Sequence, residues 1–223
     1  MTRGRFISFE GGEGTGKSTQ AAMLADILKP FGIEVVLTRE PGGSPGAEVM
    51  RHVLLSGAAK PLGVHAEAIL FAAARDDHVR QTIRPALERN QWVISDRFSD
   101  STRIYQGALS NVDPRVIKRL EQLTVGSTVP DLTIILDVPA EMGLTRAAER
   151  RGSASPDRFE TETIDFHRKL RDAYRDLAER EPDRCALIDA TADATRVCEA
   201  VWAVVDARLK PSRRPPTSDN PTL

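Results

Sequence analysis

An octapeptide close to the N-terminus restricts this chain to a small set of folds. Its sequence, Gly11-Gly12-Glu13-Gly14-Thr15-Gly16-Lys17-Ser18, matches the pattern G-x-x-x-x-G-K-[ST]. The glycines let backbone N–H groups converge on phosphate oxygens, and the helix that follows presents its positive end to the anion. Lys17 can reach the β- and γ-phosphates of a nucleotide, and the Ser18 hydroxyl can coordinate Mg²⁺. This segment, the phosphate loop, predicts binding of ATP or GTP, and we include the adjacent Thr19 in that site.

Short apolar runs alternate with helical sequence along the chain. The runs are Phe6–Phe9, Val35–Leu37, Trp92–Ser95, Leu132–Leu136 and the weaker Ala186–Ile188. Helices are expected over Lys17–Phe31, Ala47–Leu55, Ala66–Glu88 and Ala194–Leu209. The alternation predicts an α/β fold, the three-layer sandwich of P-loop nucleotide-binding proteins, with a mostly parallel five-stranded sheet, helices on both faces and a small lid.

Parallel sheets of this kind bind ligands beyond the carboxyl ends of their strands. The chemistry is therefore expected in four segments that directly follow strands: Glu10–Ser18, Arg39–Gly43, Asp96–Gln106 and Asp137.

Length and charge exclude several other classes of protein. The 223 residues suit one domain, expected over residues 1–209, and the formal net charge of −1 argues against a general nucleic-acid binder. No apolar run approaches the ~20 residues of a membrane span, and the N-terminus lacks a signal-peptide core. Cys185 and Cys198 match no metal or redox spacing, so we expect a cytoplasmic protein with two buried thiols. Residues 210–223 are proline-rich and without apolar periodicity, which predicts a disordered tail; a basic docking role is the less favoured interpretation.

Arginines suggest a second phosphorylated substrate beside the nucleotide. The chain has no N-K-x-D base-recognition motif of a GTPase. Leu55-Ser56-Gly57-Ala58 matches the L-S-G-G-Q signature of transporter ATPases only in part. Guanidinium groups bind oxyanions bidentately. The candidate arginines are Arg39, Arg75, Arg97, Arg146, Arg150, Arg151 and Arg158, of which Arg39 and Arg97 lie directly at strand ends.

Five separated motifs resemble the thymidylate kinases, of the bacterial branch in which the lid supplies an arginine. They are Thr38-Arg39-Glu40-Pro41-Gly42-Gly43, Asp96-Arg97-Phe98, the stretch from Ser101-Thr102 to Tyr105-Gln106-Gly107, Asp157-Arg158-Phe159-Glu160 and Ile188-Asp189-Ala190. The resemblance covers roughly residues 5–209. It implies transfer of the γ-phosphoryl group of MgATP to dTMP, giving dTDP for dTTP synthesis, by a homodimeric enzyme.

The resemblance also implies roles for single residues. Glu13 contacts the nucleotide's 3′-hydroxyl, Arg39 and Arg97 bind the acceptor phosphate, and Asp96 holds a magnesium-bound water or orients Arg97. Phe71, which periodicity alone would assign to the core, stacks on thymine, and Arg75, four residues on, bonds O4. Thr102 meets the base N3 edge, and Tyr105 lies where a ribose hydroxyl would clash. Pro41, Ser101 and Gln106 complete the acceptor site.

Residues 146–160 are expected to form the lid, because they are basic and Gly152–Pro156 interrupts the helical periodicity. Arg151 is the favoured catalytic arginine, followed by Arg146, which is also assigned to ATP binding, and Arg158. The phosphate loop contains Thr15 and no arginine, which fits a lid that supplies one.

Two departures from the family pattern leave substrate preference open. Phe98 stands where the family usually has Tyr or His, and Arg103, expected to face solvent, stands where smaller residues are common. Two other functions remain open at this point: a kinase for another nucleotide or small phosphorylated metabolite, and a switch-like ATPase without a second substrate.

Overall fold

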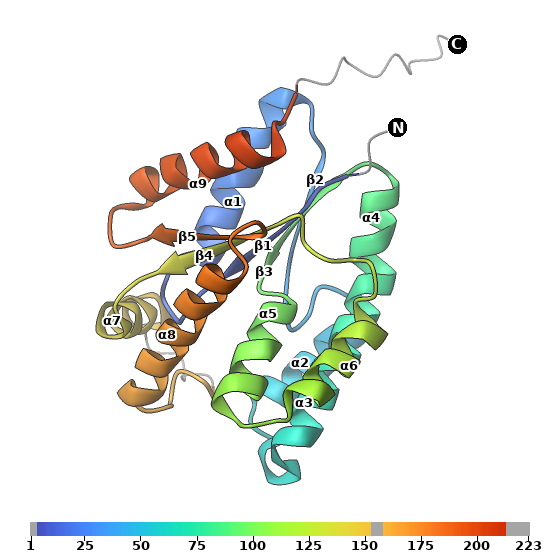
Figure 1. Cartoon of the computed structure of the whole chain (residues 1–223), viewed down its shortest axis with the longest axis vertical. Helices are drawn as coiled ribbons and strands as arrows, with labels where there is room; N and C mark the ends of the chain where they lie inside the picture. Colours follow the sequence, from blue (N-terminus) through green and yellow to red (C-terminus); the bar gives the residue numbers. More distant parts are fainter. Residues whose placement is uncertain (1–3, 153–157, 213–223) are drawn as a thin grey trace.

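The predicted five-stranded parallel sheet is confirmed by the computed structural model, which describes residues 4–152 and 158–212 (Figure 1). The strand order is β2-β3-β1-β4-β5, and all four strand pairs are parallel. The strands are β1 (Phe6–Glu10), β2 (Val35–Arg39), β3 (Trp92–Asp96), β4 (Leu132–Asp137) and β5 (Cys185–Asp189). Each contains the apolar run that predicted it. The three central strands β3, β1 and β4 are buried along almost their whole length, whereas the edge strands β2 and β5 are partly exposed.

Helical segments connect the strands. The α-helices are α1 (Lys17–Leu28), α2 (Pro45–Leu55), α3 (Gly63–His78), α4 (Arg84–Glu88), α5 (Ser99–Thr102), α6 (Pro114–Thr124), α7 (Ala140–Arg151), α8 (Ile164–Arg180) and α9 (Ala194–Leu209). Short 3₁₀ turns η1 (Lys29–Phe31) and η2 (Lys60–Leu62) and π-helical segments η3 (Val79–Ile83) and η4 (Arg103–Leu109) join some of them. The helix expected over Ala66–Glu88 is therefore α3, η3 and α4 in succession.

The two faces of the sheet are covered by different helices (Figure 1). Alternate strand residues such as Ile7 and Ile94 pack with α1 and α9, in one cluster with Leu24 and Val201. Their neighbours along the strands pack on the opposite face, against η3, α4, η4 and α8. Each fully buried aliphatic or aromatic side chain contributes about 1.5–3 kcal/mol. The alternation fixes which strand residues face which layer, and so aims the polar residues at the strand ends.

Neither the predicted tail nor the predicted lid is described over its full length. The tail expected over 210–223 lies outside the described residues from position 213 onward, and residues 153–157 of the expected lid also lie outside them. Within the described part of the chain, no helix is long and apolar enough to span a bilayer.

Candidate active site

The phosphate loop joins the end of β1 to the start of α1, as its motif requires. Gly14 has φ +66°, and a Cβ there would lie 1.9 Å from the carbonyl oxygen of Gly143 on α7, so only glycine fits. The Lys17 ammonium is buried and donates to the carbonyl oxygens of Gly11 (3.2 Å) and Gly12 (2.7 Å). Burial, and secondarily the positive charge of Arg97, lower the pKa of Lys17 to about 8. A bound phosphate group would add negative charge beside this ammonium and raise its pKa.

Ser18 and Asp96 bring two oxygen ligands together beside the loop. Asp96 is the last residue of β3 and faces α1, where the Ser18 hydroxyl donates a hydrogen bond to its carboxylate. Magnesium prefers oxygen ligands and usually binds one or two carboxylates, waters and nucleotide phosphates. A hydroxyl and a carboxylate in contact therefore fit a Mg²⁺ ion carried by a nucleotide.

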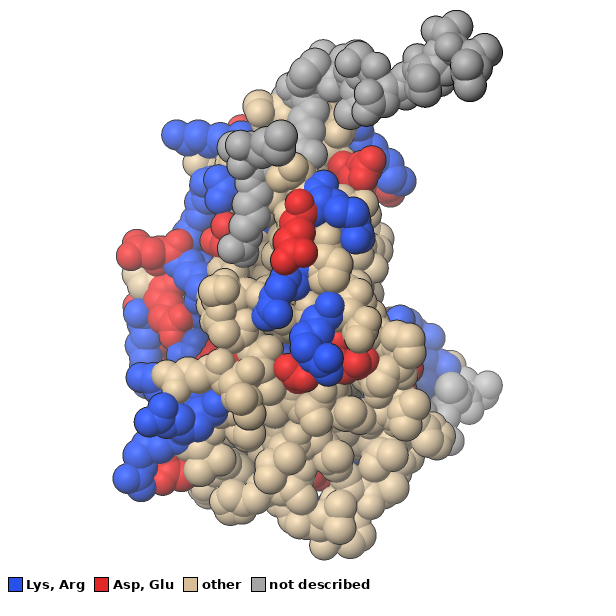
Figure 2. Space-filling view, turned by 90° about the vertical axis from the view of Figure 1, so that its right-hand side faces the viewer, with Lys and Arg blue, Asp and Glu red and all other residues tan. Residues whose placement is uncertain are grey.

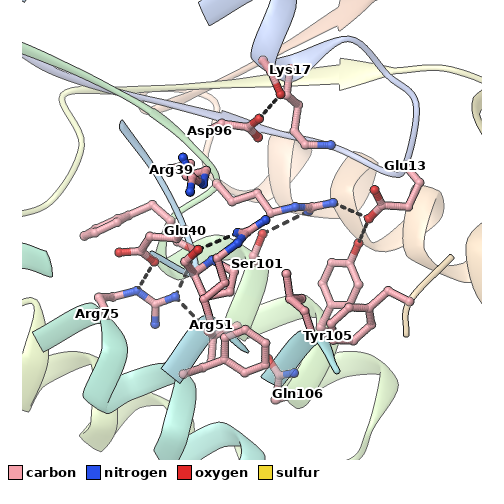
Figure 3. A pocket seen from close by; sticks show the side chains of 18 of the residues that line it. Glu13, Lys17, Arg39, Glu40, Arg51, Arg75, Asp96, Ser101, Tyr105 and Gln106 are labelled. Carbon is pink, nitrogen blue, oxygen red and sulfur yellow. Dashed lines mark hydrogen bonds and ion pairs between the residues drawn. The ribbon is translucent and has the colours of Figure 1, made fainter. Parts of the chain in front are cut away.

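Glu13 of the phosphate loop points toward Tyr105 (Figure 3), and it also pairs with Arg97. The Arg97 guanidinium donates to Glu13 Oε1 at 2.5 Å, and the Tyr105 hydroxyl donates to the same atom at 3.2 Å. Burial by itself would raise the pKa of Glu13, but Arg97 and Lys17 outweigh it and lower the pKa to about 2. The Glu13 carboxylate is therefore ionised, and can accept hydrogen bonds, at any physiological pH.

Arg75 is held by three neighbours in the wall of the site. Its side chain on α3 is buried; Nε donates to Glu40 Oε2 at 2.8 Å, and Nη2 donates to Thr102 Oγ1 (3.0 Å) and the Phe98 carbonyl (3.2 Å). His78 contacts the other Glu40 oxygen at 3.0 Å. These contacts occupy Nε and Nη2, so Nη1 is the edge of the guanidinium that remains for a ligand.

One cavity of about 380 Å³ joins these groups. Figure 3 shows Lys17 and Asp96 at one side of it and Arg75 and Gln106 at the other. All ten residues predicted to bind the acceptor line the cavity: Glu13, Arg39, Pro41, Phe71, Arg75, Arg97, Ser101, Thr102, Tyr105 and Gln106. The lining also includes Gly14, Gly16, Lys17 and Ser18 of the phosphate loop. A phosphate-binding loop and an aromatic, arginine-lined pocket thus share one space.

Comparison with known proteins identifies the family. The family model described as thymidylate kinase matches residues 9–201. A thymidylate kinase of Bradyrhizobium sp. is 61% identical over 93% of this chain and 92% of its own, and one of Nitrobacter winogradskyi is 59% identical over 95% of each. The crystal structure of thymidylate kinase from Ehrlichia chaffeensis superposes with a TM-score of 0.72 at 34% identity, covering 92% of this chain and 99% of that one. The chain belongs to the thymidylate kinase family.

The arginines expected in the lid of this thymidylate kinase family member lie in different places. Arg150 lines the cavity, whereas Arg151, the favoured catalytic residue, is not among the lining residues and forms an ion pair with Glu160. Arg158 forms an ion pair with Glu67, a buried residue of α3. Among the four arginines expected in the lid, Arg150 is therefore the one that lines the cavity.

Two further predicted arginines engage protein groups outside the lid. Arg146 donates to the carbonyl oxygens of Ala190 (2.8 Å) and Thr191 (2.9 Å), directly after β5. The Arg39 side chain is half exposed and pairs with Glu48 on α2 at 3.1 Å. Both guanidiniums keep further donors that could bind an anion.

Phe98 and Arg103, the departures from the family pattern, have structural partners. Phe98 is fully buried and packs edge-on against Phe6, with ring centroids 4.8 Å apart. Arg103 does not extend freely into solvent as expected. Its side chain is about one-third exposed and forms ion pairs with Asp100 (3.0 Å) and Glu181 (2.5 Å). A residue spacing cannot reveal such partners, because Glu181 lies 78 positions away.

Glu10 and Tyr174 support the site from behind Ser101, and neither was predicted as a site residue, although Glu10 begins one of the four segments where chemistry was expected. Glu10 ends β1, is fully buried, and accepts hydrogen bonds from Phe98 N–H (2.8 Å), Ser101 (2.7 Å) and Tyr174 (2.8 Å). Ser101 and Tyr174 also accept from Arg97, at 3.2 and 3.3 Å. Burial, then the charge of Asp100, raises the pKa of Glu10 to about 7. A carboxylate at the end of a central strand was a usable signal for Glu10; nothing local marks Tyr174.

Proposed function

We propose that this chain transfers the γ-phosphoryl group of ATP directly to the phosphate of dTMP, forming ADP and dTDP for dTTP synthesis. The observation that carries the proposal is the single cavity in which Lys17 and Ser18 lie with Phe71, Arg75 and Thr102. A switch-like ATPase would have no use for an aromatic, arginine-lined pocket that opens onto its phosphate loop. In-line transfer needs both substrates in one such space.

The donor side consists of the phosphate loop and the start of α1. The backbone amides of Gly11 to Ser18, with Thr19, would hold the ATP phosphates, and Lys17 would place its positive charge against the β- and γ-phosphates. Ser18 and Asp96 would hold Mg²⁺, which neutralises charge on the phosphates when bound. Arg146, next to the backbone after β5, is proposed to contact the bound nucleotide.

The acceptor side uses the remaining cavity residues. Arg97 and Arg39 would bind the dTMP phosphate, while Glu13 would accept from the 3′-hydroxyl without losing its hold on Arg97. Phe71 would stack on thymine, the free Nη1 of Arg75 would donate to O4, and Thr102 would meet N3. Tyr105, which is buried beside Glu13, would exclude a ribose hydroxyl. Pro41, Ser101 and Gln106 complete the wall.

An arginine from residues 146–160 would stabilise the transition state. Phosphoryl transfer develops negative charge on the equatorial oxygens, and a guanidinium stabilises it. Arg151 remains our proposed lid arginine, for which release from Glu160 would be required. Arg150, which lines the cavity, is the competing candidate, and Arg158 is the third. Comparing kcat for Arg150→Ala and Arg151→Ala decides between the first two, because the catalytic arginine should lower kcat with little change in either KM.

The experiment for the overall reaction is ADP formation from MgATP with dTMP, dUMP, AMP, CMP or GMP added separately, and with no acceptor. We expect strong turnover with dTMP, well above that with dUMP. Turnover with another acceptor would assign the chain to a different phosphorylated substrate. Equal ADP formation without any acceptor would indicate an ATPase.

We further propose a cytoplasmic homodimer. At the level of α2, α3 and α6 the surface in Figure 2 carries few charged side chains. Val49 on α2, Ile69 on α3 and Leu123 on α6 are 69%, 55% and 80% exposed, which is unusual for large aliphatic residues. Light scattering should give a mass near twice 24.5 kDa, lowered by Leu123→Asp; a wild-type mass of one chain would refute the dimer. The two free, buried cysteines support the proposed compartment.

A further inference from the structure

Four charged side chains form a closed ring behind the acceptor pocket. Asp100 pairs with Arg103 (3.0 Å), Arg103 with Glu181 (2.5 Å), Glu181 with Arg184 (2.6 Å), and Arg184 closes the ring on Asp100. The last contact is bidentate, with Arg184 Nη1 and Nη2 at 2.6 and 3.0 Å from the two carboxylate oxygens. Carboxylates and guanidiniums alternate around the ring, so every contact is attractive.

The ring connects two parts of the fold that are distant in sequence. Asp100 lies on α5 and Arg103 begins η4, whereas Glu181 and Arg184 lie in the turn between α8 and β5. Thr133 of β4 anchors the ring to the sheet, because its hydroxyl donates to Asp100 (3.2 Å) and accepts from Arg184 (2.7 Å). The helical segment formed by α5 and η4 is thereby held against the rigid centre of the molecule.

Burial makes the Asp100–Arg184 contact the strongest geometric constraint of the ring. The Asp100 side chain is 1% exposed and that of Arg184 is 18% exposed. A buried ion pair is not strongly stabilising by itself, but removing one partner leaves an uncompensated buried charge and displaces the group that carried it. The contact therefore fixes where Asp100, and the backbone on either side of it, can lie.

The same segment carries four of the proposed acceptor-binding residues. Ser101 and Thr102 directly follow Asp100, and Tyr105 and Gln106 follow Arg103; all four line the cavity, whereas Asp100 and Arg103 do not. With only four residues, α5 has little stability of its own, and η4 departs from regular α-helical hydrogen bonding. Tertiary contacts therefore determine the position of the cavity residues. The ring supplies those contacts on the side of Asp100 and Arg103, and Arg75 and Glu13 supply others from within the cavity.

We propose that Asp100 and Arg184 are positioning residues that set the placement of Thr102 and Tyr105, and so control affinity for the acceptor and discrimination between deoxyribose and ribose. Arg103 and Glu181 complete the ring and limit its movement. The proposal rests on the function proposed above, since it assigns the ring to the acceptor side of that reaction.

The test compares Arg184→Met, Arg184→Lys and Asp100→Asn with Asp131→Asn. The control residue accepts from Arg5 (3.1 Å) and from Phe6 N–H (2.7 Å), directly before β4 at the opposite end of the sheet from the cavity. The measurements are kcat, KM for dTMP and for ATP, and the ratio of kcat/KM for dTMP to that for ribothymidine 5′-monophosphate. Calorimetry of dTMP binding without ATP and the Tm of each variant accompany them, and assays are run at least 15 °C below the lowest Tm.

We expect Arg184→Met and Asp100→Asn to raise KM and Kd for dTMP tenfold or more, with KM for ATP changed less than twofold, and to lower the deoxyribose preference several-fold. Arg184→Lys, which keeps the charge, should recover part of both effects. Asp131→Asn should lower the Tm and leave the dTMP parameters unchanged. Wild-type dTMP affinity and sugar preference in folded Asp100→Asn and Arg184→Lys would overturn the proposal, even if Arg184→Met fails to fold. Absence of dTMP turnover by the wild-type protein would instead refute the proposed function.

Discussion

Glu10→Gln is a nearly isosteric change that tests the buried hydrogen-bond network beneath Arg97. Glu10 accepts from Phe98 N–H through Oε1 and from the hydroxyls of Ser101 and Tyr174 through Oε2. In the glutamine variant Oε1 can still accept from Phe98, and both hydroxyls can rotate to accept from the new amide. The variant therefore keeps the shape of the network and removes only the ionisation.

The magnitude follows from the pKa of about 7 in the folded protein, compared with 4.5 for an ordinary glutamate. Between these values the folded state keeps a proton that the unfolded state has released, so stability falls as the pH rises. The contribution is fully present below pH 4.5 and is lost as the pH passes through 7. At about 1.4 kcal/mol for each pH unit of difference, the wild-type protein should lose roughly 2–3 kcal/mol between pH 5 and pH 8 through this one group.

Urea unfolding of the wild-type protein and Glu10→Gln at pH 5, 6, 7 and 8 measures this difference. Groups remote from Glu10 titrate equally in the two proteins, so the free energy of unfolding of Glu10→Gln relative to wild type should increase by roughly 2–3 kcal/mol across this range. Glu88→Gln, an exposed change on α4, should show no such trend. Parallel pH profiles for wild type and Glu10→Gln would refute the conclusion that burial disfavours the ionised carboxylate.

Three further predictions concern the cavity. Lys17→Ala should abolish turnover while the circular dichroism spectrum stays intact, and near-normal kcat in the variant would contradict the role of Lys17. Calorimetry at pH 8 should show proton uptake on ATP binding by the wild type only, because the bound phosphates raise the Lys17 pKa from about 8 and the amine takes up a proton. Arg75→Ala should raise KM for dTMP at least tenfold and KM for ATP little, and should lower the free energy of unfolding by about 3–5 kcal/mol because Glu40 loses its cation; equal effects on both KM values would remove Arg75 from the base pocket. Glu13→Gln should lower kcat/KM for dTMP by about ten- to a hundredfold. Because the pKa of Glu13 is about 2, its titration should not lower the kcat/KM of the wild type above pH 4, and a fall in kcat/KM between pH 6 and pH 4 that the variant lacks would contradict this.

The sequence was most informative where one local requirement decides the structure. The three central strands were predictable because parallel strands covered on both faces need a continuous apolar run, and the partly exposed edge strands β2 and β5 have shorter runs of the same kind. The cavity residues were predictable because parallel strands bring their carboxyl ends to one edge, where the phosphate loop, Arg39 and the Asp96-Arg97 pair all lie. Phe71 and Arg75 needed the family resemblance, because periodicity alone assigns Phe71 to the core.

Contacts across the layers were beyond local patterns. The strand order depends on pairing between segments far apart in the sequence. The Glu10–Tyr174 hydrogen bond and the Arg103–Glu181 ion pair depend on the packing of α8 against the rest of the fold. Arg103 was expected in solvent because long charged side chains are mostly exposed, and the sequence does not reveal its ion pairs with Asp100 and Glu181. The burial of Glu10 could not be predicted either, because a charged residue at the end of a strand is usually exposed.

Phosphorus NMR of MgATP and dTMP mixed with the protein tests phosphoryl transfer between the two sides of the cavity most directly. We expect the dTMP resonance to be replaced by the two doublets of dTDP, in step with conversion of ATP to ADP and without free inorganic phosphate. Accumulation of inorganic phosphate with dTMP unchanged would contradict the proposed reaction and indicate that the cavity hydrolyses ATP without serving an acceptor.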